Sequence, residues 1–261
     1  MGSNIITGWR VQRRVIGALM IRELNTRYGR ENIGFLWIMV EPLLFAVLVG
    51  IVWRMLKGPE EHGISVVAFI ASGYIPITLF RHAVNRSVRV FSVNSSLMYH
   101  QQIKVLDFIT VRFLVEFIGS MMAYFFIAVI LIFLHEFPVP DNLGLLFAGW
   151  FLYALFTFSL CLILAPLSEL SDVLEKLVPV TTYIMIPFSG TFNMTSWLTP
   201  EAQSVMYYSP FVQAMEMMRE GIFGARVNAI HDWRVPFFTS LAFMLIGLAM
   251  CRRIRRRLVV E

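Results

Sequence analysis

The sequence predicts an all-α membrane protein with six transmembrane helices, and three observations lead to this fold class. Of the 261 residues, 57% are hydrophobic and only 15% are charged, whereas soluble domains have about 45–50% apolar and about 25% charged residues. The apolar residues form long uninterrupted runs, several of them near the ~20 residues that a helix needs to cross a bilayer. The arginines gather at the ends of these runs, as in multi-pass membrane proteins.

An amphipathic helix is expected over residues 5–24, before the first span. At about 100° per residue, Arg10, Arg13 and Arg14 share one side of this helix, and apolar residues gather on the other. Such a helix can lie in the membrane interface, with its arginines toward lipid phosphates or a partner. It can also act only as a topological anchor, and the two roles are compatible.

The first span, at about 34–53, follows the basic segment with Arg27 and Arg30 without a linker. Glu41 and Pro42 lie within this span. An acidic side chain at the centre of a membrane helix costs roughly 2.5 kcal/mol or more. We therefore expect Glu41 either to line a pore or to pair with a polar group of a neighbouring span.

Five further spans are expected, separated by short polar segments. The second contains Pro76, and the fifth is interrupted by Pro179 and Pro187, because proline kinks or breaks helices. Arg112 and Glu116 are four residues apart at the start of the third span, a spacing that permits an ion pair on one helix face. These spans lie at about 64–84, 108–134, 143–166, 177–193 and 235–251.

Residues 194–233 form neither a clean span nor a soluble domain. They contain two short amphipathic stretches, at about 200–207 and 211–223, and each is too short to cross a bilayer. We expect a re-entrant hairpin, which is tolerated only where protein or water satisfies its backbone. The single domain then consists of an interface helix (1–33), spans one to five (34–193), the hairpin (194–233), span six (234–251) and a tail (252–261).

The arginine distribution predicts the orientation. The N-terminal segment carries six arginines and the C-terminal tail five, whereas the turn at 135–142 has neither lysine nor arginine. Positive loops stay in the cytoplasm, so both termini and the segments 85–107 and 167–176 are expected there. The external segments are expected at 54–63, 135–142 and 194–233.

The sequence lacks the motifs of an enzyme or of an ATP-binding protein. Gly29 and Gly34 have the glycine spacing of a P-loop, but Phe35 stands where the lysine must be. The five histidines have no partner at helical spacing, so no metal site is expected. The predicted spans contain no paired acid and base, so no catalytic site is expected either. A polytopic membrane transferase would need an acid–base or metal constellation, which makes it the weaker alternative to a transporter subunit.

Aromatic residues are abundant, with 23 Phe, 8 Tyr and 6 Trp. Most are expected in the helix core or in the belts at the membrane surface, yet aromatic rings also stack on sugar rings. The residues expected along a translocation path are Trp37, Glu41, Tyr74, Trp150, Tyr153, Tyr183, Phe188 and Phe192.

The stretch RYGRENIGFLW at residues 27–37, followed by Glu41, Pro42 and Leu43, resembles the signature of ABC-2 type polysaccharide export permeases. The order of elements agrees with that family: an amphipathic N-terminal helix, six spans, and a re-entrant pair before the last span. The resemblance covers essentially the whole chain. The short loops are similar to those of the capsular polysaccharide branch.

The resemblance implies a homodimeric pore-forming subunit in the bacterial inner membrane, paired with two copies of a separate cytoplasmic ATPase. That ATPase would bind ATP and Mg, and no cofactor is expected in this chain. The cargo would be a long anionic polysaccharide on a lipid, passed on to a periplasmic adaptor and an outer-membrane channel. O-antigen and teichoic acid are alternative cargoes, which the sequence does not separate from capsule.

The resemblance also implies roles for particular residues. Short coupling helices near 89–97 and 169–175 would pass the motion of the ATPase to the spans. Arginines would bind the lipid phosphate where the substrate enters, although each could instead be a positive-inside anchor: Arg27, Arg30, Arg86 and Arg89. The residues expected to couple to the ATPase are Arg10, Arg13, Arg14, Val93, Asn94, Leu97, Glu169, Asp172 and Glu175.

Overall fold

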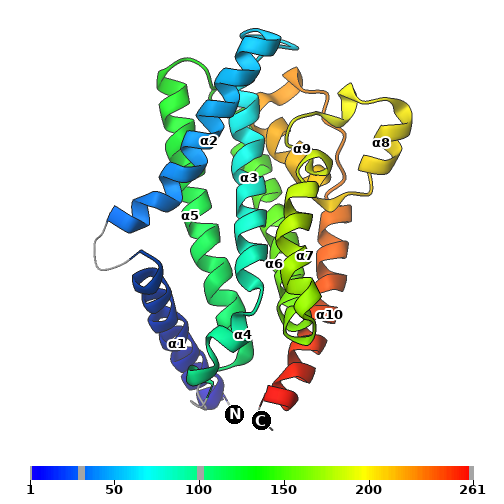
Figure 1. Cartoon of the computed structure of the whole chain (residues 1–261). Coiled ribbons are helices and arrows are strands. Elements are labelled where there is room, and N and C mark those ends of the chain that lie inside the picture. The colour runs from blue at the N-terminus through cyan, green and yellow to red at the C-terminus, as the bar shows by residue number, and fades with distance from the viewer. Residues whose placement is uncertain (1, 29–32, 99–102, 259–261) are drawn as a thin grey trace.

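A computed structural model describes residues 2–28, 33–98 and 103–258, and most of them are helical. Long helices run side by side, with α1, α4 and the end of α10 at one end of the molecule and α8 at the other (Figure 1). The helices are α1 (Gly2–Tyr28), α2 (Ile33–Lys57), α3 (Val66–Ser87), α4 (Val90–Val93), α5 (Val105–Phe133), α6 (Leu143–Leu170), α7 (Asp172–Ile184), α8 (Pro200–Met206), α9 (Pro210–Phe223) and α10 (Arg234–Leu258). The remaining elements are strands β1 (Glu60–Glu61) and β2 (Ile64–Ser65), and the 3-10 turns η1 (Ser95–Leu97), η2 (Pro187–Ser189), η3 (Thr195–Trp197) and η4 (Gly224–Arg226).

Four helices within the described residues are long and apolar enough to cross a membrane: α3, α5, α6 and the part of α10 up to Ile254. Each covers a predicted span. Helix α2 covers the first predicted span and is 25 residues long, or about 37 Å at 1.5 Å per residue. Helix α2 continues through Pro42, as predicted for a single helix over the first span.

The fifth predicted span, 177–193, is not one continuous helix. Helix α7 begins earlier, at Asp172, because α6 continues to Leu170 and only Ser171 separates the two helices with extended backbone. It ends at Ile184 after 13 residues, or about 20 Å, which is short of ~30 Å of hydrocarbon. Beyond it, η2 begins at Pro187, and Gly190 turns the chain with φ 76°.

The predicted hairpin region contains two short helices, α8 and α9, close to the expected positions. Both start with proline at the first helical position, where its missing N–H costs nothing. Helix α9 is buried in the bundle and packs closely on α6. A Cβ atom on Gly221 would lie 2.4 Å from the backbone nitrogen of Leu146, so only glycine permits this contact.

A β-hairpin, which the sequence did not predict, joins α2 to α3. His62 and Gly63 form its two-residue turn with φ of 54° and 74°, the positive values that tight hairpin turns require. The hydroxyl of Ser65 donates to Glu136 at 2.5 Å, and Arg54 pairs with the same carboxylate at 2.7 Å. The hydrogen bonds from Ser65 and Arg54 lower the pKa of Glu136 and fix the hairpin to the turn after α5.

Candidate functional site

Glu169, near the end of α6, holds the short helix α4 in place. Its Oε1 accepts hydrogen bonds from the backbone N–H groups of Phe91 and Ser92, both at 3.0 Å. The N-cap residue of α4 provides no side-chain cap, so this distant carboxylate satisfies N–H groups that the helix itself leaves free. Ser168 Oγ also accepts from the N–H of Arg89 at 3.1 Å, and α4 is therefore attached to α6.

Arg89 joins α4 to α7. Its backbone has φ 49°, a left-handed conformation that is uncommon for residues other than glycine. Its Nη2 lies 2.7 Å from Asp172 Oδ1 and 2.9 Å from Glu175 Oε2. We call these three residues the clasp. The two segments expected to couple to the ATPase, 89–97 and 169–175, thus contact each other directly.

Helix α1 presents Arg10, Arg13 and Arg14 outward and packs part of its apolar side inward. Leu19 is buried, and Gln12 donates a hydrogen bond to Asp107 at the start of α5. The side chains expected on the opposite face are all exposed: Arg10, Arg13 and Arg14. The amphipathic pattern therefore corresponds to one packed and one open side of α1.

Two further contacts, which the sequence did not indicate, connect α1 to the same end of the bundle. Arg22 Nη1 donates to Asn94 Oδ1 at 3.0 Å, while Asn94 Nδ2 donates to the carbonyl of Val90 at 2.8 Å. Glu23 lies 3.6 Å from Arg112 Nε on α5. Asn94 is therefore a buried link between α1 and α4, whereas Val93 beside it is exposed.

The expected pairing of Arg112 with Glu116 is wrong. Glu116 has no exposed surface, and its Oε1 lies 2.7 Å from Arg86 Nε on α3, with His82 Nδ1 at 3.6 Å from its Oε2. Arg112 instead donates to the carbonyl of Arg86 at 2.5 Å. A buried carboxylate needs a cation with good geometry, and the neighbouring helix α3 supplies it.

The arginines expected to bind a lipid phosphate fall into two groups. Arg86 and Arg89 are already paired with carboxylates, so a phosphate would have to compete with Glu116 or with the clasp. Arg30 and the side chain of Arg27 lie outside the described residues. So do the side chains of Trp37 and Glu41, two residues of the expected path.

The other residues of the expected path also separate into two environments. Trp150 and Tyr153 lie inside the bundle on α6, with 3% and 0% of their surface exposed, and Tyr74 is buried on α3. Tyr183 and Phe188 are exposed, and Phe192 stacks on Trp53 with 5.5 Å between ring centroids. In one copy of the chain, these aromatic residues therefore lie partly inside the bundle and partly on its surface.

A buried arginine on α9 was missed by the sequence prediction. Arg219 has no exposed surface. Its Nη1 donates to the carbonyls of Gly190 and Asn193 at 2.6 and 3.2 Å, and its Nη2 to that of Thr191. The guanidinium also lies 3.8 Å from the centroid of the Phe69 ring, a cation–π contact. Arg219 thus holds the loop after η2 against α3.

Two more polar residues of α9, at three-residue intervals, bind the loops around it. Glu216 accepts from the N–H of Thr195 at 2.7 Å and from that of Ile230 at 3.1 Å. Gln213 accepts from the N–H of Asp232 at 2.5 Å. The signal in the sequence is a polar residue every third position within an apolar helix. That spacing alone does not tell what the residues contact.

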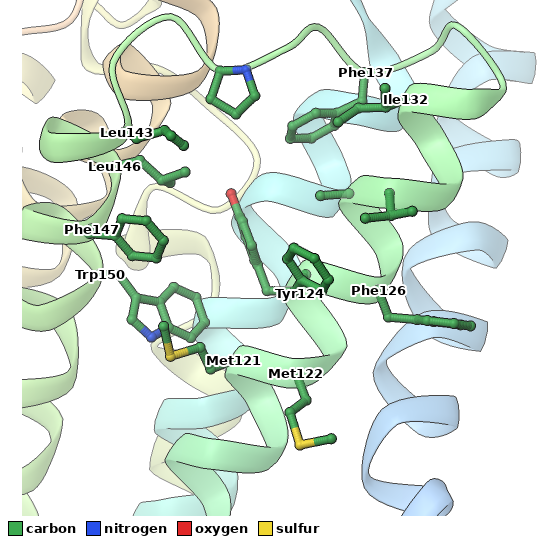
Figure 2. Close-up of a pocket in the computed structure, with 14 residues that line it drawn as sticks. Met121, Met122, Tyr124, Phe126, Ile132, Phe137, Leu143, Leu146, Phe147 and Trp150 are labelled. Carbon is green, nitrogen blue, oxygen red and sulfur yellow. The ribbon is translucent and has the colours of Figure 1, made fainter.

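A groove of about 620 Å³ lies between α5 and α6. Its lining is apolar except for the hydroxyl of Tyr124 and the indole N–H of Trp150, and neither has a hydrogen-bond partner within the described part of the chain. Figure 2 shows both side chains at the groove, with the Tyr124 hydroxyl directed toward the turn that joins the helices. Across the described residues, no three His, Cys, Asp or Glu side chains gather as metal ligands.

Comparisons with known proteins identify the family of the chain. The family model described as "ABC-2 type transporter" matches residues 14–223. The chain is 35% identical to the capsule polysaccharide export inner-membrane protein BexB of Haemophilus influenzae, over 93% of this chain and 91% of BexB. It is 36% identical to CtrC of Neisseria meningitidis serogroup B, of the same description, over 92% and 91%. It is 24% identical to the polysialic acid transport protein KpsM of Escherichia coli, over 94% and 95%.

Proposed function

Because this chain belongs to the ABC-2 type transporter family, we propose that it is the membrane-spanning subunit of an ATP-driven exporter of capsular polysaccharide in the bacterial inner membrane. The observation that carries the proposal is similarity over nearly the full length to inner-membrane proteins of capsule polysaccharide export. The resemblance found in the signature of residues 27–43 is thereby confirmed.

The proposed topology has six crossings with both termini in the cytoplasm. The crossings are α2, α3, α5, α6, the segment formed by α7 and η2, and α10. Helix α1 and the C-terminal end of α10 lie at the same end of the molecule (Figure 1), and both helices carry exposed arginines, which supports placing that end in the cytoplasm. Helices α8 and α9 then form a hairpin on the external side.

The coupling mechanism follows from the contacts of α4. Two copies of a separate ATPase subunit, which bind ATP and Mg, would press on α4 and on the exposed arginines of α1. Since Glu169 holds α4 to α6 and the clasp holds it to α7, a displacement of α4 is passed to both helices. Val93 and Asp172 are exposed beside these contacts and are the proposed points of contact with the ATPase.

The remaining parts of the proposal concern cargo and partners. Arg27 and Arg30 would bind the phosphate of a lipid-linked polysaccharide, with less contribution from the paired Arg86 and Arg89. The subunit would work as a homodimer, together with a periplasmic adaptor and an outer-membrane channel. O-antigen or teichoic acid is the alternative cargo.

A complementation experiment tests the function. We expect this chain, expressed with its ATPase in a capsule-producing strain that lacks its own permease, to restore polysaccharide at the cell surface. A variant ATPase without its P-loop lysine is the matched control and should leave the polysaccharide inside the cell. Surface polysaccharide in the absence of an active ATPase would contradict the proposal.

A further inference from the structure

The groove between α5 and α6 has no part in the proposed export mechanism, and we propose that it binds one acyl chain of a bilayer phospholipid. The inference requires only that α5 and α6 lie in a membrane. It therefore stands or falls independently of the cargo and of the ATPase partner.

The groove has the size and lining of a binding site for an apolar ligand. Its volume of about 620 Å³ lies within the range of about 300–1,000 Å³ that is usual for small-molecule sites. Figure 2 shows the 14 lining residues on facing sides of the two helices and on the turn between them. They include two methionines, Met121 and Met122, whose flexible side chains adapt to irregular partners.

The surroundings of the groove favour lipid over water. Both walls are helices long and apolar enough to cross a membrane, and Phe125 at the opening is 72% exposed, so the groove opens toward hydrocarbon. A bound water needs two to four polar partners. Tyr124 and Trp150 supply the minimum for a single water, and the rest of the groove is lined by apolar side chains that offer water no partner. An empty groove would leave its lining atoms without dispersion contacts.

The shape of the opening favours a chain over a second helix. The opening carries bulky exposed side chains on both walls: Phe125, Phe126, Leu143 and Phe147. A helix is about 10–12 Å wide with its side chains, so these residues would keep it out, while a flexible acyl chain can pass between them.

The two unpaired donors indicate where the lipid is anchored. Trp150 is 3% exposed, and its indole N–H has no acceptor among the described residues; the same holds for the buried hydroxyl of Tyr124. Buried tyrosine and tryptophan donors normally have a partner. An ester carbonyl at the head of the acyl chain supplies an acceptor, and the Tyr124 hydroxyl points toward the turn, where that head would lie (Figure 2).

The bound chain would brace α5 against α6. Although these helices are consecutive, α6 packs mainly on α9 and α10, and the groove separates part of α5 from α6. Because α5 carries Glu116 and α6 carries Glu169, the lipid would stabilise the two helices that hold the polar contacts at the other end.

Photolabelling tests the proposal on the full permease with its ATPase. The complex is purified from cells that make no polysaccharide and placed in phosphatidylethanolamine–phosphatidylglycerol vesicles that contain phosphatidylethanolamine with a diazirine on its acyl chain. We expect label to concentrate on residues 121–132 and 143–150. Ala128→Phe, which fills the groove, should lower this labelling about tenfold, equivalent to about 1.4 kcal/mol of binding. Ala242→Phe on the exposed face of α10 is the matched control and should not.

A milder variant supports the test, and four outcomes would contradict the proposal. Tyr124→Phe removes only the hydroxyl, and we expect weaker labelling of the same residues with an unchanged elution profile of the complex. If Ala128→Phe does not fold, the labelling of Tyr124→Phe still tests whether the groove binds the acyl chain. The proposal is overturned by labelling spread evenly over the exposed faces of α5, α6 and α10, or by none at the groove. The proposal is also overturned if another protein is found crosslinked at the groove, or if the groove is labelled only when the polysaccharide-linked lipid is present.

Discussion

Arg219 is completely buried, although arginine is almost never buried unless it is paired. Its partners are backbone carbonyls of the loop at 190–193. The planar guanidinium has five donors in a fixed fork, so one side chain can satisfy several carbonyls that the irregular loop leaves free. Gly73 provides the space for it, since a Cβ there would lie 2.5 Å from Arg219 Nη2.

We expect Arg219→Met to lower the free energy of unfolding by roughly 3 kcal/mol or more, because several buried carbonyls lose a charged donor. Arg219→Lys should fall between this variant and the wild type, since lysine lacks the fork. Thermal unfolding in detergent measures the effect. The matched control is Arg226→Met at an exposed position, where we expect a change within about 0.5 kcal/mol. Equal losses at both positions would contradict the role given to Arg219.

At the scale of elements, α4 is the best example of a short helix that others hold in place. Four residues cannot form a stable helix alone in water. Glu169 of α6, the clasp with α7, and Arg22 of α1 acting through Asn94 all fix it. The acidic residues of 169–175, expected from the family resemblance to face the ATPase, thus bind α4 and Arg89 of their own chain.

Exchanging the charges of Arg89 and Glu175 tests whether Arg89 acts through its ion pairs in the clasp or by binding phosphate. We expect Arg89→Glu to lower polysaccharide export and the double variant Arg89→Glu, Glu175→Arg to recover part of it. Unfolding should change little, because exposed ion pairs contribute about 0–1 kcal/mol. Surface polysaccharide and thermal unfolding are measured together. The control is Lys176→Glu, which reverses an exposed charge on α7 next to Glu175. This variant should export normally.

The outcome distinguishes the two roles of Arg89. If the guanidinium of Arg89 binds the phosphate of the cargo, the double variant has no arginine at position 89 to bind it. The exchanged ion pair between positions 89 and 175 then cannot restore export. Full loss in the double variant, together with normal unfolding, would therefore reject the clasp as the coupling contact and favour phosphate binding.

For the whole molecule, the exposed apolar faces of α2 and α7 are the proposed contact between two copies. Leu44, Phe45 and Leu48 on α2 are exposed, as are Val180 and Ile184 on α7. A pore between two copies would bring the exposed aromatic residues Tyr183 and Phe188 toward its wall. This arrangement would explain why Tyr183 and Phe188 are exposed in one copy.

Cysteine crosslinking in native membranes tests this contact, after Cys161 and Cys251 have been replaced by alanine. We expect the pair Leu48→Cys and Ile184→Cys, placed on separate copies, to form a disulfide-linked dimer on oxidation. Leu245→Cys on α10, at a similarly exposed apolar position, is the control and should stay monomeric. A dimer linked through α10 but not through α2 and α7 would place the interface elsewhere.

The sequence by itself determined the membrane class, a helix before the first span, and the positions of α2, α3, α5, α6, α8, α9 and α10. It also carried the signature of residues 27–43 that identified the family. These features are encoded locally: the length of an apolar run, a proline at a helix start, or arginines at a helix end can be read without knowing any neighbour. The family resemblance, rather than the local sequence, led to the expectation that α1, 89–97 and 169–175 couple to the ATPase.

Only the tertiary structure decided which helices are neighbours, and the remaining features depend on that. Glu116 pairs with Arg86 rather than Arg112 because α3 lies against α5. Arg219 and the clasp join residues 26–29 and 83–86 positions apart, separations over which sequence spacing carries no information. The groove at Tyr124 and Trp150 exists because α6 packs on α9 and α10 more than on α5. Hydrophobicity predicts that these helices enter the membrane, but the fit of side chains between them determines which polar groups meet.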